Sequence, residues 1–198
     1  MRLVLASSNP GKLREIRALF PPTIELVAQT ELGIEEAEEP HDTFLENALA
    51  KARHASRATG LPALADDSGL CVPALGGEPG VHSAYYAGRE GSREERDARN
   101  NAKLVAALRT RDRAAYYYCV LVLLRSAHDP APVVADAAWH GSIELEPRGS
   151  GGFGYDPHFR VEPLGMTAAQ LPAAEKNRLS HRGKALARLA ARLGARAG

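Results

Sequence analysis

The stretch Leu3-Val4-Leu5-Ala6-Ser7-Ser8-Asn9-Pro10-Gly11-Lys12 decides how this chain folds. Its first four residues form a short apolar run closed by polar residues, which is typical of a buried strand. Asn9 is a favourable helix N-cap, and Pro10 suits the first helical position. Apolar residues then recur at helical spacing as far as Phe20, and Pro21-Pro22 is expected to end the helix. The chain therefore opens as strand, polar loop and helix, which predicts an α/β fold.

The same alternation continues beyond the opening. Thr43 followed by Glu46 is a capping-box pattern, and the alanine-rich helix behind it is expected to end at Gly60. Residues 63–65 are predicted as a second buried strand, which ends in Asp66-Asp67-Ser68-Gly69.

The second half of the chain predicts mainly strands. A capped helix begins at Ser92, and a last helix runs from Ser180 to Gly194. The predicted strands between them cover residues 116–124, 132–139, 141–145 and 159–161. No internal repeat or long linker interrupts this pattern, so we expect a single α/β domain over residues 1–198, built as two lobes.

Composition excludes several classes of protein. Lys plus Arg is 25 against Asp plus Glu 24, a net charge of +1, which argues against a protein that binds nucleic acid or an anionic membrane surface. The longest apolar stretch, residues 116–124, is about half of the roughly 20 residues that a membrane helix needs. Two cysteines make neither a disulfide scaffold nor a four-ligand zinc site. We expect a soluble, cytoplasmic protein.

The loop at residues 7–12 is a candidate phosphate site. A strand that leads through a small polar loop into a helix brings free backbone N–H groups and the positive end of the helix dipole together, and Lys12 adds a mobile charge. It is not a P-loop, because Ala6 and Leu13 stand where the first glycine and the Mg²⁺-binding hydroxyl belong. An ordinary capped helix with a solvated lysine explains the same residues.

Two acidic pairs are candidate metal ligands. Adjacent side chains on a strand point in opposite directions, so only one of Asp66 and Asp67 is expected to face a ligand. Glu38 and Glu39 precede the helix that carries Lys51. Mg²⁺ bound to polyphosphate takes one or two protein carboxylates, which such a set supplies. The alternatives are an Asp-rich turn and acidic residues that complement a helix dipole.

Two later segments are candidates for recognising a flat ring and an anion. Glycines in residues 151–157 let the backbone approach a ligand, and Phe153 or Tyr155 can stack on a ring. A tight turn with a packed aromatic side chain is equally consistent. Basic side chains in residues 175–177 and 180–184 lie at and before a helix start, where they oppose the dipole unless an anion compensates.

Taken together and in this order, the motifs resemble the inosine triphosphate pyrophosphatase family, and the resemblance covers essentially the whole chain. The motifs are Ser7-x-Asn9-x-x-Lys12, Phe44-x-Glu46-Asn47-Ala48-x-x-Lys51-Ala52, Ala65-Asp66-Asp67-Ser68-Gly69, Gly152-Phe153-Gly154-Tyr155-Asp156-Pro157 and Ser180-His181-Arg182-Gly183.

The resemblance implies a long mixed central sheet flanked by helices, with a nucleotide cleft between two lobes. It also implies a homodimer that depends on Mg²⁺. The activity that it implies is hydrolysis of non-canonical purine nucleoside triphosphates (ITP, dITP and XTP) to the monophosphate and pyrophosphate, which cleanses the nucleotide pool.

The resemblance also implies roles for individual residues. Asp67 is the expected catalytic base, assisted by Lys12 and Lys51, and Asp67 and Glu39 are the expected metal ligands, with Glu38 left open as the alternative. The expected substrate contacts are Ser7, Ser8, Asn9, Pro10, Gly11, Lys12, Ser68, Phe153, Gly154, Tyr155, Asp156, Lys176, His181 and Arg182.

One departure from the family pattern is Tyr85, which stands where the family has an arginine. Any charge contact made by that arginine is absent unless Arg89 supplies it. Two rival functions fit parts of the pattern: a nucleotide-binding module without turnover, and a related pyrophosphatase for modified pyrimidines or methylated bases. A nucleotide-binding module without turnover would gain nothing from Asp67. A pyrophosphatase for modified pyrimidines or methylated bases does not account for the loop at 152–157.

Overall fold

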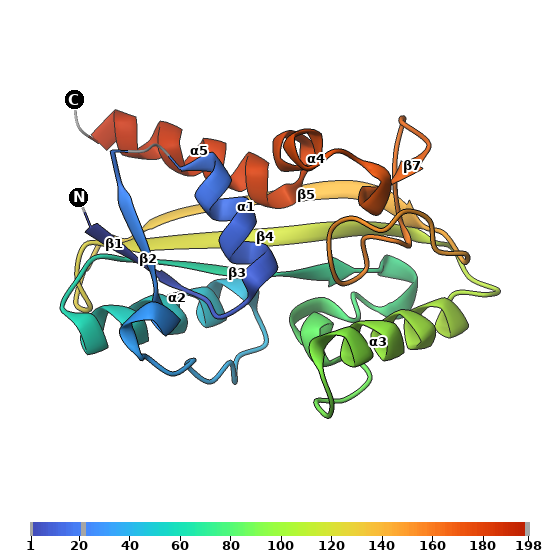
Figure 1. Ribbon diagram of the computed structural model, residues 1–198, viewed down its shortest axis with the longest axis horizontal. Helices are drawn as coiled ribbons and strands as arrows, with labels where there is room; N and C mark the ends of the chain where they lie inside the picture. Colours follow the sequence, from blue (N-terminus) through green and yellow to red (C-terminus); the bar gives the residue numbers. More distant parts are fainter. Residues whose placement is uncertain (1, 21–22, 197–198) are drawn as a thin grey trace. The chain divides into compact units, whose positions relative to one another are not determined.

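The computed structural model describes residues 2–20 and 23–196. Helices and strands alternate along the first third of the chain (Figure 1), as the opening pattern predicts. The strands and α-helices are β1 (Arg2–Ala6), α1 (Pro10–Leu19), β2 (Glu25–Ala28), α2 (Phe44–Thr59), β3 (Ala63–Cys71), α3 (Arg93–Ala107), β4 (Ala114–Leu124), β5 (Val133–Ile143), β6 (Phe159–Val161), β7 (Met166–Thr167), α4 (Ala173–Leu179) and α5 (His181–Arg196). The 3-10 turns are η1 (Gln29–Leu32), η2 (Pro73–Leu75), η3 (Gly80–Tyr85) and η4 (Ala168–Gln170).

Among the described residues, seven strands form one sheet in the order β2-β1-β3-β4-β5-β6-β7. β1 is parallel to β2 and β3, whereas β6 is antiparallel to β5 and β7. The mixed α/β sheet implied by the motifs is therefore confirmed.

The described chain divides into two compact units. Unit 1 lies within residues 1–67, 119–137 and 181–198, and unit 2 within 68–118 and 138–180. Neither unit is one continuous stretch, because β3, β4 and β5 each contribute to both. The single domain over residues 1–198 stays a prediction.

Unit 1 has helices on both faces of its strands (Figure 1). Leu3, Leu5 and Leu64 share a buried cluster with apolar side chains of α1 and α5, including Ile16 and Leu186. On the other face, α2 contacts β1 and buries Ala48, Ala52 and Ala55. Each fully buried large aliphatic side chain contributes about 1.5–3 kcal/mol. This layering gives alternate residues of a strand different helical neighbours.

Unit 2 has a separate core. Leu104 of α3 and Leu108, which caps the C-terminal end of that helix, are fully buried in it. Phe159 lies 4.7 Å from the ring of Tyr117 and 5.1 Å from that of Trp139, measured between ring centroids. This aromatic cluster supports the loop that follows β5.

The predicted helix starts are confirmed. Asn9 caps α1, Thr43 caps α2, Ser92 caps α3, and Gly60 ends α2 in the left-handed conformation that favours glycine. Pro21-Pro22 lies outside the described residues.

Several predicted boundaries are wrong. β3 does not end at Asp66 but continues to Cys71, because buried apolar residues follow Gly69. β5 is one strand across His140, whose ring lies 5.4 Å from that of Tyr116. α5 continues past Gly194, which lacks the positive φ of a helix end. β2, β7 and α4 were not predicted, since each is short. No helix in the described ranges is long and apolar enough to cross a membrane.

Candidate active site

The loop at residues 7–12 in unit 1 has the local structure that a phosphate site needs. The Asn9 side chain accepts hydrogen bonds from the backbone N–H groups of Gly11 (2.9 Å) and Lys12 (3.1 Å), which orders the first turn of α1. Ser7 and Gly11 are buried, while Ser8 is partly exposed. The positive end of the α1 dipole therefore lies next to Ser8 and Asn9.

The two aspartates of β3 face opposite layers of unit 1, as strand geometry predicts. Asp66 meets Lys12 of α1 at 2.6 Å and Arg182 of α5 at 2.8 Å. Asp67 meets Lys51 of α2 at 2.8 Å. The pair of adjacent carboxylates is thus split between two separate ionic clusters.

The Asp66 cluster is buried. Arg182 also donates to Glu15 of α1, and the Cys119 thiol donates to Asp66 at 3.1 Å. Burial alone would raise the pKa of Asp66, but Arg182 and Lys12 outweigh it and hold that pKa well below its usual range. Asp66 is therefore charged at neutral pH and orients Lys12.

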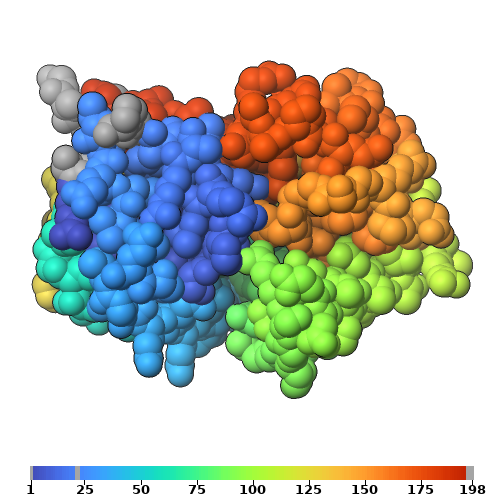
Figure 2. Space-filling model, in the orientation of Figure 1, coloured from blue at the N-terminus to red at the C-terminus, as the bar shows by residue number. Residues whose placement is uncertain are grey.

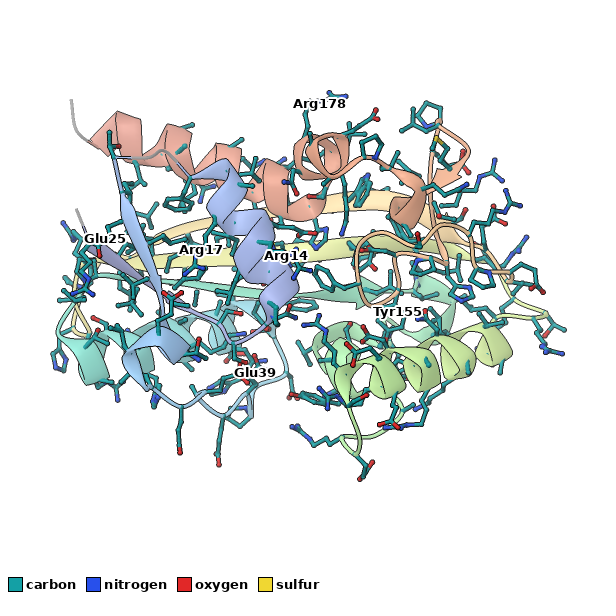
Figure 3. The ribbon with its side chains drawn as sticks, viewed as in Figure 1. Arg14, Arg17, Glu25, Glu39, Tyr155 and Arg178 are labelled. Carbon is teal, nitrogen blue, oxygen red and sulfur yellow. The ribbon has the colours of Figure 1, made fainter. Side chains whose placement is uncertain are left out.

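We expect Arg182→Ala to lower the free energy of unfolding by about 3 kcal/mol, because it removes a buried ion-pair partner from the buried Asp66 charge. Urea denaturation measures this. Since the folded-state pKa of Asp66 is lowered, the wild-type advantage shrinks as the pH falls below about 4. Arg178→Ala, on an exposed side chain of α4 (Figure 3), is the control and changes stability by less than about 0.5 kcal/mol. Equal stability of Arg182→Ala and wild type would contradict the expectation.

The second cluster joins Asp67, Lys51 and Glu39. The Lys51 ammonium donates to both carboxylates and is itself buried. Figure 3 shows Glu39 on the segment that leads into α2. Asn47 fixes this segment, because its side chain exchanges two hydrogen bonds of 3.0 Å with the backbone of His41.

The electrostatics of this cluster shift the pKa values of the two carboxylates in opposite directions. Burial raises the pKa of Asp67, and the negative charge of Glu39 raises it further. The positive charges of Lys51 and Lys12 lower this pKa but do not cancel the rise. Burial also acts on Glu39, but the Lys51 charge outweighs it and lowers the pKa of Glu39. Burial opposes the charge on Lys51, yet Asp67 and Glu39 raise its pKa. A carboxylate with a raised pKa is the better general base.

The cluster fits a divalent cation that also binds phosphate. Asp67 Oδ2 is buried and has no hydrogen-bond partner within the described part of the chain. Among the described residues, no three acidic, histidine or cysteine side chains converge as a complete metal site. Mg²⁺ in phosphate-transfer sites takes one or two carboxylates and completes its shell with phosphate and water, so Glu39 and Asp67 are a sufficient pair.

The loop at residues 149–157 in unit 2 has no regular structure, as predicted, and Asp156 organises it. Asp156 is buried and accepts hydrogen bonds from Lys176 Nζ (2.6 Å), the Phe153 N–H (2.8 Å) and the Tyr117 hydroxyl (3.2 Å). Gly152 has a φ of +72°, and a Cβ there would lie 2.1 Å from Asp156. Only glycine permits this close approach.

The two aromatic side chains of this loop differ in exposure. Tyr155 is buried in the core of unit 2, and its hydroxyl donates to the Ser83 carbonyl at 2.8 Å. Phe153 is partly exposed, with Lys176 Nζ 4.8 Å and the Arg93 guanidinium 5.0 Å from its ring centroid. Phe153 is therefore the ring that a ligand can reach.

The remaining predicted residues have defined places. Ser68 lies in β3, partly exposed, at the start of unit 2. His181 is a buried residue at the start of α5. Arg89, the alternative to the missing family arginine, lies with its guanidinium 4.3 Å from the Tyr85 ring centroid, so a cation does stand beside this tyrosine.

Sequence reasoning missed several residues that support these clusters. Glu15 lies three residues after Lys12 on α1, and that spacing on one helix face is the available signal. On α3, Asp97 accepts from the Gly154 N–H at 3.0 Å, and Asn101 donates to the Gly154 carbonyl at 2.9 Å. Their partners are distant in sequence, so only the fold reveals them.

The sequence of this chain is similar to those of known proteins. The Ham1 family model matches residues 3–192. A dITP/XTP pyrophosphatase of Burkholderia pseudomallei is 66% identical over 195 residues, covering 98% of this chain and 93% of that protein. One from Nitrosomonas europaea is 64% identical over 190 residues, covering 95% and 92%.

Solved structures agree with the sequence matches. A HAM1 protein from Coxiella burnetii has a TM-score of 0.89 at 46% identity and covers 98% of each chain. The Ham1 protein of Staphylococcus aureus has a TM-score of 0.86 at 38% identity, covering 99% of this chain and all of that one. The chain therefore belongs to the Ham1 family, the inosine triphosphate pyrophosphatase family that its ordered motifs predicted.

Proposed function

We propose that this chain hydrolyses ITP, dITP and XTP to the nucleoside monophosphate and pyrophosphate, and so cleanses the nucleotide pool. The observation that carries the proposal is the Asp67–Lys51–Glu39 cluster, with a buried carboxylate oxygen of Asp67 left without a hydrogen bond in the described chain. A protein that only bound phosphate anions would gain nothing from two carboxylates there. The similar proteins from Burkholderia pseudomallei and Nitrosomonas europaea, both dITP/XTP pyrophosphatases, support the same substrate class.

Residues of unit 1 would act on the triphosphate and on water. Within residues 7–12, phosphate oxygens would be bound by the N–H and hydroxyl of Ser8 and by the Lys12 ammonium, while Asn9 orders the helix start. Asp67 would orient a water molecule and take its proton as the water attacks the α-phosphorus. Lys51 holds Asp67 in place and would stabilise the negative charge that develops on the leaving pyrophosphate.

Mg²⁺ is the metal that we propose for this site, held by Glu39 and Asp67. When bound, it would make the attacking water more acidic and neutralise phosphate charge.

Recognition of the base would use separate residues. Phe153 would stack on the purine. The loop around Gly154, with Asp156 and Lys176, would face its polar edge, and His181 is a further candidate donor to the base. Tyr155, being buried, would act by supporting the loop.

Product analysis tests the bond that is broken. Incubation with ITP and Mg²⁺ should yield IMP and pyrophosphate in equal amounts, resolved by anion-exchange chromatography. Little IDP or orthophosphate is expected, because attack at the α-phosphorus releases the two terminal phosphates together. Release of IDP as the main product would refute the proposal.

Two further properties follow from the family resemblance. A homodimer is expected, and light scattering coupled to size-exclusion chromatography measures it. The protein is expected in the cytoplasm, where such a nucleotide pool is found.

A further inference from the structure

The acidic segment at residues 33–42, which connects η1 to α2, contacts the proposed phosphate site of unit 1 twice. Glu39 reaches Lys51, as described above. Three residues earlier, Glu36 accepts hydrogen bonds from the backbone N–H of Ser8, at 3.1 Å, and from the Ser8 hydroxyl. Both Ser8 donors end on the same carboxylate oxygen of Glu36, and the mechanism above uses no contact of this kind.

The contact places an anionic oxygen where a phosphate oxygen is expected. A backbone N–H and a hydroxyl just before a helix start are the donors that bind phosphate in other helix-terminus sites. A carboxylate oxygen satisfies them in the same way, as a charge-assisted acceptor. While Glu36 occupies these donors, a triphosphate cannot use them, and the two negative charges repel each other.

Glu36 is free to leave without disturbing the core. Its side chain is exposed, and the residues on either side of it are exposed or only partly buried. In Figure 2 the corresponding light-blue segment protrudes from the surface of unit 1. Displacement therefore exposes no buried apolar surface, and its main cost is the loss of the two hydrogen bonds from Ser8.

We propose that Glu36 is an internal competitor for the phosphate-binding donors of Ser8, so that an anionic substrate binds only after the Glu36 carboxylate swings out. The proposal rests on the phosphate role proposed above for residues 7–12. The apparent dissociation constant then equals the intrinsic one divided by the fraction of molecules in which Ser8 is accessible.

The test measures binding of inorganic pyrophosphate by isothermal titration calorimetry at fixed ionic strength. Glu36→Ala should lower its dissociation constant by about three- to tenfold, which corresponds to about 0.7–1.4 kcal/mol. Glu36→Gln should give a smaller gain, because the amide oxygen still accepts from Ser8 but lacks the charge. The KM for ITP should fall in parallel with kcat nearly unchanged, since Glu36 does not contact Lys51 or Asp67 in the structure.

The matched control is Glu35→Ala in the same exposed segment. Glu35 contacts His54 through its backbone carbonyl, so the variant removes an equal charge without removing a carboxylate from Ser8. An equal gain in both variants would reduce the effect to general electrostatics and overturn the proposal. Weaker pyrophosphate binding by Glu36→Ala would also overturn it and make Glu36 a support for the loop.

The same experiment separates this proposal from the proposed function. Pyrophosphate binding that is equal in wild type and Glu36→Ala, and lost in Lys12→Met, would overturn competition by Glu36 while leaving the phosphate site intact. Absence of pyrophosphate binding in all variants would overturn both.

Discussion

Asp67→Asn should lower the turnover of ITP by about 10²-fold or more. The amide keeps the shape of the side chain and can still meet Lys51, but it cannot accept a proton from water and carries no charge toward a metal. The loss should appear in kcat at saturating ITP and Mg²⁺, because the substituted atom acts on the attacking water. Steady-state assays of pyrophosphate release measure the change.

Asp129→Asn is the matched control for this variant. Asp129 is another buried aspartate of unit 1, ion-paired with Arg125 at 2.7 Å, and it lies outside the proposed site. This substitution should leave turnover unchanged even where it lowers stability. Near wild-type turnover of Asp67→Asn at saturating Mg²⁺ would remove Asp67 from the mechanism.

The second large effect concerns the choice of base, and wild-type protein should prefer ITP to ATP in kcat/KM by about 10⁴-fold or more. Hypoxanthine presents an oxo group at position 6, which accepts hydrogen bonds, whereas adenine presents an amino group there. Donors arranged for an oxo group are left unpaired by ATP, and an unpaired buried donor is costly. Parallel assays of both nucleotides at equal Mg²⁺ give the ratio.

Two variants locate the source of this preference. His181→Ala should reduce the ITP/ATP ratio, because it removes a candidate donor to the oxo group. Phe153→Ala should lower kcat/KM for both nucleotides and move the ratio by less than about tenfold, since stacking does not distinguish the two purines. Equal cleavage of ATP and ITP by the wild type would leave a general nucleotide hydrolase and refute the purine-specific proposal.

Much of unit 1 was predictable from local pattern. Asn9, Thr43 and Gly60 mark helix ends through their own side-chain or backbone chemistry, and the structure confirms each of them. The opposite directions of Asp66 and Asp67 follow from the two-residue repeat of a strand and are likewise confirmed by their partners. The role of each carboxylate in catalysis stays a prediction.

Other features could not be predicted, because their causes lie far apart in sequence. β3 continues through the polar residues Asp66 to Gly69, although an Asp-rich turn fits the same residues locally. It does so because Lys12, Arg182 and Lys51, supplied by three different helices, neutralise the two aspartates. Without those partners, two adjacent carboxylates in a buried strand would be strongly destabilising.

The sequence by itself determined the α/β class, the order of the motifs and the family, since each depends on short-range spacing. Only the tertiary structure decided how the candidate residues are used: it pairs Arg182 with Asp66 and Glu15, places Tyr155 in a core and leaves Phe153 accessible, and sets Glu36 on Ser8. The physical reason is that burial and ion pairing depend on which elements meet in space. Spacing along the chain specifies a helix face or a strand face, but not the partner that it meets.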